Sequence, residues 1–212
     1  QRYQGKVNKS CQLLLGPQYV LLRDEFYMPL KKIDNKTKRL LVYFSAADPN
    51  SLTMAAIRAV SNLKDIKLLV DIVINNSHPQ QANISRLCHN LDNVTLHIQT
   101  TKMAQLMVNA DLMLGAGGST HWERCFLGLP ALVVTLADNQ VETTRYLHQL
   151  GVCEWLGHFD CITETIINQQ IRLFIQAPEL LINMRKAAKK IMGVGDSGTV
   201  RVIQAIEARL AC

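Results

Sequence analysis

Short apolar runs alternate along the chain with segments in which hydrophobic residues recur at helical spacing. The runs have the length of strands and little polar alternation, which is typical of strands buried on both faces of a sheet. Strands are predicted at 40–44, 67–74, 94–98, 111–114, 131–136 and 153–156. Helices are predicted at 52–63, 82–91, 103–109, 120–127, 139–150, 162–176, 178–192 and 198–210. This alternation predicts an α/β fold, a doubly wound parallel sheet of the Rossmann-like kind with right-handed crossovers.

The alternating pattern covers 38–212 and is absent from 1–37. Within that first part, LLLG (Leu13–Gly16) followed by PQYVLLRDEF suggests a last strand and a linker from an upstream domain. We therefore expect residues 1–37 to end an N-terminal domain and 38–212 to form one complete domain. At the start of the first predicted helix, Ser51 has the side chain of an N-cap residue.

Composition narrows the class of protein. The 212 residues are 48% hydrophobic, which is enough for one ample core. Apolar runs fall far short of the ~20 residues that a membrane span needs, and no leader sequence opens the chain, so a soluble cytoplasmic protein is expected. A net charge of +6 suits an anionic ligand, but it could equally serve solubility alone. Nucleic acid is disfavoured because the sparse aromatic residues are not interleaved with the basic ones.

The six cysteines show no CxxC spacing, which favours free thiols in a reducing compartment. The histidines show no HxxxH or H–E pairing either. We therefore predict no metal site. His121 is the one histidine beside the candidate ligand loop described next, and a structural role is expected for it.

The candidate chemistry lies in GAGGSTHWERCFLGLP (Gly115–Pro130), where glycines separate a predicted strand from a predicted helix. In open parallel sheets, ligands bind at the carboxyl ends of the strands. Glycines there let backbone amides approach a phosphate, and the helix N-terminus favours negative charge. The spacing matches neither GxGxxG nor GxxxxGK[ST], so adenine dinucleotide and ATP chemistry are not supported and no cofactor is predicted.

Two pairs of polar residues near this loop, Thr120 with Glu123 and Asn139 with Gln140, each have a structural and a ligand-binding interpretation. Thr120 and Glu123 have the T-x-x-E spacing of a capping box, in which the carboxylate only closes the helix start. Alternatively, Glu123 lies one turn below a bound diphosphate and accepts hydrogen bonds from ribose hydroxyls. Asn139 and Gln140 could likewise form a polar helix start or face a ligand at the same sheet edge.

The run ADLMLGAGGSTHWERCFLGLPALVVTLADNQ (Ala110–Gln140) resembles the second domain of GT-B-fold sugar-nucleotide enzymes. Within that group it is most similar to the UDP-2,4-diacetamido-2,4,6-trideoxy-beta-L-altropyranose hydrolase family of pseudaminic acid biosynthesis. Three further segments resemble that family in order and spacing: Leu13–Phe26, Leu96–Asp111 and Asp196–Val202.

The resemblance implies a role for each candidate residue. It implies that the diphosphate of a UDP-sugar is cradled by Gly117, Gly118, Ser119 and Thr120. It further implies that Glu123 holds the ribose, that the stretch near Ile98 and Met103 faces the uracil, and that Asn139 and Gln140 reach the sugar. The partner would be this small molecule, and the reaction would need no metal.

Two departures from the family pattern are visible. The histidine that the family carries in an N-terminal glycine-rich loop would lie upstream of Gln1, so the chain is expected to be catalytically incomplete alone. Before Asp48 the family usually has paired glycines, whereas Ser45, Ala46 and Ala47 stand here.

The favoured function is therefore the nucleotide-binding half of a hydrolase that cleaves a UDP-linked deoxy-amino sugar in surface-glycan biosynthesis. One alternative is a GT-B glycosyltransferase with a UDP-sugar donor, since acceptor choice would lie outside these residues. The other is a non-catalytic nucleotide-sugar-binding or docking module, for which the lost glycine pair is the best indication. Titration with UDP separates the enzyme functions from the docking module.

Overall fold

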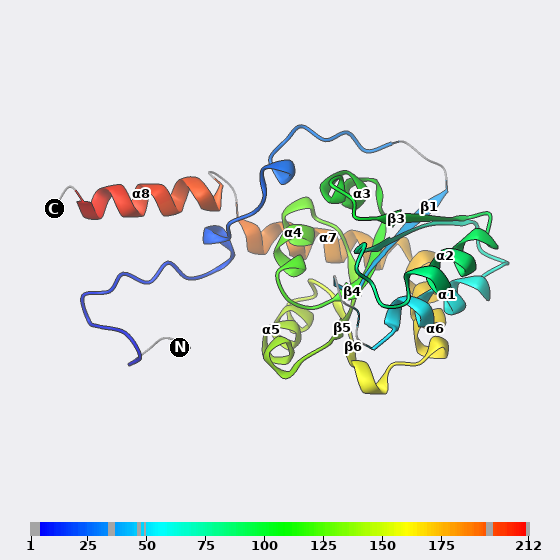
Figure 1. The fold of residues 1–212 in the computed structure, drawn as a ribbon. Coiled ribbons are helices and arrows are strands. Elements are labelled where there is room, and N and C mark those ends of the chain that lie inside the picture. The colour runs from blue at the N-terminus through cyan, green and yellow to red at the C-terminus, as the bar shows by residue number, and fades with distance from the viewer. Residues whose placement is uncertain (1–4, 34–36, 46–47, 49, 194–196, 211–212) are drawn as a thin grey trace.

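Six parallel strands form the centre of the computed structural model, which describes residues 5–33, 37–45, 48, 50–193 and 197–210. Their order in the sheet is β3-β2-β1-β4-β5-β6, and every neighbouring pair is parallel (Figure 1). The strands are β1 (Lys38–Tyr43), β2 (Leu68–Ile74), β3 (Val94–Ile98), β4 (Leu112–Ala116), β5 (Ala131–Thr135) and β6 (Glu154–His158). The sheet confirms the predicted doubly wound α/β fold.

Helices cover both faces of the sheet because the strands alternate their side chains between two cores. On β1, Leu40 and Val42 pack into one core with α1 (Leu52–Ser61), α2 (Gln81–His89) and α6 (Glu164–Gln176). Leu41, between them, packs into the other core with α3 (Met103–Asn109), α4 (Thr120–Leu127) and α5 (Asp138–Gln149). Both faces are therefore buried, as the continuous apolar runs indicate.

The cap of α1 differs from the prediction. Ser51 occupies the N-cap position, but its side chain makes no capping hydrogen bond and its φ is 57°. Instead, the carboxylate of Asp48 accepts hydrogen bonds from the backbone N–H groups of Leu52 (3.0 Å) and Thr53 (2.8 Å). An ionised carboxylate is a stronger acceptor than a hydroxyl at a helix N-terminus, which explains why Asp48 takes this role.

The segment before the sheet forms the short 3-10 helices η1 (Pro17–Tyr19) and η2 (Asp24–Phe26). Residues 13–16 form no strand within the described residues 5–33, and because the predicted strand would belong to an upstream domain and pair there, it stays a prediction. An extended segment becomes a strand only when a neighbour pairs with its backbone. Residues 1–4 and 34–36 of this predicted linker lie outside the described part of the chain.

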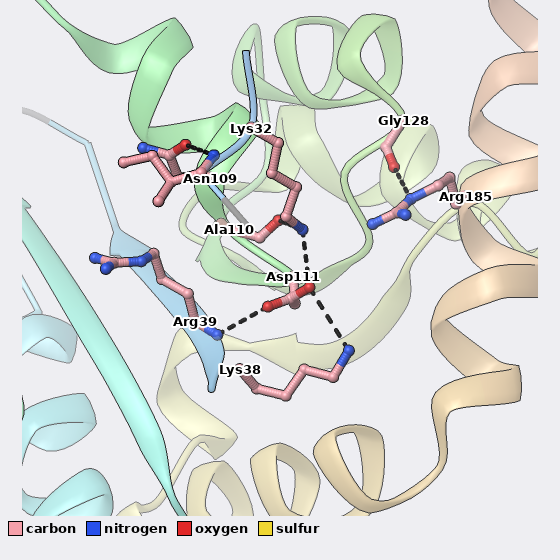
Figure 2. A network of polar contacts seen from close by, with 9 residues as sticks. Lys32, Lys38, Arg39, Asn109, Ala110, Asp111, Gly128 and Arg185 are labelled. Atoms are coloured by element: carbon pink, nitrogen blue, oxygen red, sulfur yellow. Dashed lines mark hydrogen bonds and ion pairs between the residues drawn. The ribbon is translucent and has the colours of Figure 1, made fainter. Parts of the chain in front are cut away.

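Asp111, just before β4, fastens the end of this segment to the sheet (Figure 2). Its carboxylate accepts a hydrogen bond from Lys32 Nζ (2.9 Å) and another from the backbone N–H of Arg39 (2.9 Å). Lys38 Nζ lies 3.7 Å away. Burial alone would raise the pKa of Asp111, but these partners outweigh it and hold the pKa below its usual value. The start of β1 is thus tied to the start of β4.

The C-terminal part is helical. Helix α7 (Pro178–Met192) crosses beside α4, and α8 (Gly198–Leu210) extends away from the body of the domain (Figure 1). Arg209 on α8 donates a hydrogen bond to the backbone oxygen of Ser10 (2.7 Å), so the two terminal segments contact each other. Across the residues that the structure describes, every helix is too short or too polar to cross a membrane.

Candidate functional site

The order of the strands places a crevice between β1 and β4. From β1 the chain proceeds outward to β2 and β3, and then returns to continue on the other side with β4, β5 and β6. Such a reversal is where open α/β sheets bind ligands, outside the carboxyl ends of the strands. The loop after β1 begins at Phe44, and the glycine loop 115–118 ends β4 at the same edge, where Tyr43 pairs with Gly115.

The glycines of this loop serve different purposes. A Cβ on Gly115 would lie 2.4 Å from the backbone oxygen of Tyr43, so this glycine permits close pairing of β4 with β1. A Cβ on Gly117 would lie 3.0 Å from Thr144 Oγ1 and 3.1 Å from Gln140 Oε1, so this glycine permits contact with α5. Gly118 has a φ of 106°, a conformation that favours glycine, and a Cβ there would lie 3.8 Å from Gln140 Nε2, an ordinary van der Waals distance. Protein packing thus requires that Gly115 and Gly117 lack a side chain, whereas at Gly118 the positive φ favours glycine.

A cavity of about 280 Å³ opens beside the loop. It brings together four of the predicted ligand residues: Met103, Ser119, Thr120 and Glu123. Its other lining residues are Arg23, Tyr43, Val73, Ile74, Asn75, Gln99 and Thr100.

The remaining predicted positions lie around this cavity without lining it. Gly117 is buried against α5, and Gly118 is half-buried behind Ser119. Ile98 is exposed, and the two residues after it take the lining position that was predicted for it. Asn139 is exposed at the start of α5, whereas the side chain of Gln140 folds back, and its Oε1 accepts a hydrogen bond from the backbone N–H of Leu136 (2.8 Å).

Glu123 does not form the capping box. The N-cap of α4 is Ser119 and makes no side-chain capping bond, so Glu123 stands one position beyond the place that a box requires. Its carboxylate instead accepts hydrogen bonds from Arg23 Nε (3.3 Å) and Nη2 (3.1 Å). With 16% of its side chain exposed, Glu123 stands at the cavity wall with an ionic partner rather than at the helix backbone.

Sequence reasoning missed Arg23 as a site residue. Its guanidinium bridges Glu123 and Glu25 (2.7 Å), and Glu25 in turn accepts a hydrogen bond from the backbone N–H of Ala104 at the start of α3. Arg23 is the one cation among the residues that line the cavity. The signal was present in LLRDEF, a polar triplet inside an apolar linker, but its partner lies 100 positions away.

Tyr43 is a second lining residue that the sequence did not reveal. Burial, and then the negative charge of Glu123, raises the pKa of its phenol above the usual value despite the opposing charge of Arg23. The phenol therefore stays protonated at neutral pH and can donate a hydrogen bond into the cavity.

The loop after β1 keeps a glycine-like backbone without glycine. Ser45 has a φ of 92°, a conformation that favours glycine. Ala46 and Ala47 lie outside the described residues.

His121 has no access to the cavity. It is 1% exposed and bonded on both ring nitrogens, as expected of a structural histidine. In the described ranges, no three His, Cys, Asp or Glu side chains gather in a group that could hold a metal ion.

The parallel sheet, its crevice and the glycine loop define a Rossmann-like α/β domain of the kind found in GT-B enzymes. Residues 50–196 match the family described as Glycosyltransferase family 28 C-terminal domain, and the chain belongs to that family.

Two relatives are similar to this chain over most of its length. The chain is 26% identical over 200 residues to the spore coat polysaccharide biosynthesis protein SpsG of Bacillus subtilis (strain 168), covering 92% of this chain and 58% of SpsG. It is 24% identical over 149 residues to the UDP-2,4-diacetamido-2,4,6-trideoxy-beta-L-altropyranose hydrolase of Campylobacter jejuni subsp. jejuni serotype O:2, covering 70% of this chain and 53% of the hydrolase. The chain thus spans little more than half the length of these two relatives.

Among solved structures, MurG of Acinetobacter baumannii aligns with a TM-score of 0.63 at 21% identity. The alignment covers 87% of this chain and 52% of MurG. At this identity the likeness shows the fold alone.

Proposed function

We propose that the chain is the nucleotide-binding half of a hydrolase that cleaves a UDP-linked deoxy-amino sugar to free sugar and UDP during surface-glycan biosynthesis. In this proposal residues 38–212 hold the nucleotide sugar, and 1–37 lead from an N-terminal domain. The observation that carries the proposal is the cavity at the β1–β4 crevice. There a helix N-terminus with two hydroxyls, Ser119 and Thr120, stands beside one carboxylate and one guanidinium.

These groups match the parts of a UDP molecule. The first turn of α4 offers N–H groups and hydroxyls to the diphosphate, and the guanidinium of Arg23, which also pairs with Glu123 and Glu25, lines the same cavity. Glu123 can hold two ribose hydroxyls with its two oxygens. The strand end at Gln99 and Thr100, with Met103 below, offers a partly apolar wall to the uracil. Gly117 and Gln140 then position the loop against α5 without contacting the ligand, and Asn139 contacts the sugar.

Bond cleavage would place negative charge on the departing UDP. The hydroxyls of Ser119 and Thr120 and the guanidinium of Arg23 line the cavity in which that charge would develop, and fixed donors of this type stabilise such charge. The relatives extend well beyond the length of this chain, and we propose that the group activating water lies in the domain they add. Hydrolysis is favoured by the similarity to the altropyranose hydrolase.

Calorimetric titration of the 212-residue chain with UDP tests the binding proposal. Glu123→Ala should weaken UDP binding about 10- to 100-fold, because hydrogen bonds to a charged group contribute about 1.5–3 kcal/mol. The matched control is Glu164→Ala, which removes a carboxylate paired with Arg58 on α1, at the other face of the sheet. This control should bind UDP as the unaltered chain does.

An unaltered chain that does not bind UDP would contradict the proposal and favour the docking module. If Glu123→Ala bound UDP as tightly as the unaltered chain, Glu123 would not be a ligand-binding residue.

A glycosyltransferase with the same half-fold is the second candidate, favoured by the family to which the chain belongs. Incubating a longer chain, which carries a preceding domain, with a UDP-sugar in water separates the two activities. Release of free sugar supports the hydrolase, whereas turnover that requires an added acceptor supports the transferase.

A further inference from the structure

A buried polar chain connects α4 to α5 beneath the glycine loop. Arg124, 1% exposed, is the largest of the fully buried side chains. Its Nη2 lies 2.6 Å from His121 Nδ1, and His121 Nε2 lies 2.9 Å from Thr144 Oγ1 on α5. The second terminal nitrogen of Arg124 is also bonded, since its Nη1 donates to the backbone oxygen of Val152, just before β6 (3.1 Å).

The direction of each hydrogen bond follows from the chemistry of arginine. A guanidinium can only donate, so His121 Nδ1 must accept. The proton of the neutral ring is then on Nε2, which donates to Thr144. Burial, and then the charge of Arg124, lowers the pKa of His121 to about 3. The imidazole therefore keeps one protonation state and one tautomer throughout the neutral range.

The last member of this chain contacts the candidate ligand loop. Thr144 Oγ1 lies 3.0 Å from the position that a Cβ on Gly117 would take, and Gln140, one turn earlier on α5, is as close. The loop that leads into α4 therefore lies so close to α5 at Gly117 that a side chain would not fit between them. On the side of α4 that faces the cavity stand Thr120 and Glu123, whereas His121 between them points into the protein.

We propose that Arg124, His121 and Thr144 are positioning residues that set the spacing of α4 and α5 and thereby the affinity of the site for UDP. The inference rests on the proposed function. None of the three lines the cavity, so each acts through the placement of Gly117–Thr120 and Glu123. Burying the guanidinium of Arg124 is costly, since its Nε has no hydrogen-bond partner among the described residues, and a role in holding site geometry explains why it stands here.

Two substitutions at Thr144 test the proposal. Thr144→Val keeps the shape of the side chain but leaves the buried Nε2–H of His121 without its acceptor. We expect a tenfold loss of UDP affinity by calorimetry. Thr144→Ser restores the hydroxyl and should bind UDP within twofold of the unaltered chain. Asn168→Ala is the matched control, because it removes another interhelical hydrogen bond, from Asn168 to the backbone oxygen of Ala59 (2.8 Å), on the opposite face of the sheet.

A purely structural role would lower the melting temperatures of Thr144→Val and Asn168→Ala alike and leave UDP affinity unchanged in both. That result would overturn the inference while leaving the proposed function intact. If the unaltered chain binds no UDP, the inference and the proposed function are both overturned.

Nitrogen NMR of the His121 imidazole gives a readout that does not depend on a ligand. His121 should show the neutral Nε2–H tautomer from pH 5 to 8, and titration of this ring near pH 6.5 would overturn the inference.

Discussion

At the residue scale, the backbone conformation of Ser45, beside the candidate site, is expected to lower the stability of the folded chain. Its φ of 92° places a side chain in a conformation that glycine adopts freely. Replacement by glycine should therefore relieve strain in the folded chain, although glycine also gains freedom in the unfolded chain. We expect Ser45→Gly to raise the free energy of unfolding by about 1 kcal/mol, measured by urea denaturation.

Ser45→Ala separates this strain from any effect of the hydroxyl, because it keeps the Cβ. Its stability should stay close to that of the unaltered chain. If alanine stabilised the chain as much as glycine, the hydroxyl rather than the backbone would be the source of the cost.

At the scale of elements, one buried carboxylate joins three strands. Asp71 on β2 is 2% exposed and accepts hydrogen bonds from Arg39 Nη1 on β1 (2.7 Å) and from His97 Nε2 on β3 (2.8 Å). Burial alone would raise the pKa of Asp71, but the bonds from His97 and Arg39 outweigh it, so the pKa lies below its usual value. The stability that Asp71 contributes is therefore fully present above the pKa that an aspartate has in the unfolded chain, about 3.9. It is lost as the pH falls through the lower folded value.

Asp71→Asn should lower the free energy of unfolding by about 3 kcal/mol at pH 7, because it leaves Arg39 without its anionic partner. The loss should shrink as the pH is lowered below 4, where the aspartate itself becomes protonated. Urea denaturation at pH 7, 5 and 3 measures both effects. The control is Asp65→Asn, which removes an exposed partner of Arg172 and should change stability little at any pH. A loss in Asp71→Asn that is the same at every pH would contradict the electrostatic explanation.

The elements could be predicted from the sequence because their signals are local. Apolar runs and helical spacing gave β3, α3, α4, α7 and α8 with their observed bounds. Contacts between distant residues could not be predicted in this way. The pairing of Arg23 with Glu123 depends on how the linker lies across α3 and α4. The T-x-x-E spacing indicated a capping box, but α4 begins one residue earlier than the box requires, and Glu123 pairs with Arg23 instead.

At the scale of the whole molecule, α8 packs on the segment that precedes the sheet, and that segment contacts the domain through Arg23, Glu25 and Lys32. Gly198, the first residue of α8, is buried, and a Cβ there would lie 2.0 Å from the backbone oxygen of Val20. Beyond this point α8 leaves Ile203, Ile206 and Leu210 exposed. The attachment of α8 to the linker therefore depends on the missing side chain of Gly198.

Gly198→Ala should displace α8, because the atoms that it meets are backbone and cannot rotate away. Hydrogen exchange should become faster across 198–210 and around Val20, while the amides of β1, β2 and β4 keep their protection, since the sheet has its own two cores. The control is Thr199→Ala, at the exposed position that follows Gly198, and it should leave hydrogen exchange unchanged both in 198–210 and around Val20. UDP affinity should also be unchanged, because α8 does not line the cavity. Faster exchange throughout the sheet would instead show that α8 and the domain unfold as one cooperative body, and that the terminal segments stabilise the sheet that carries the site.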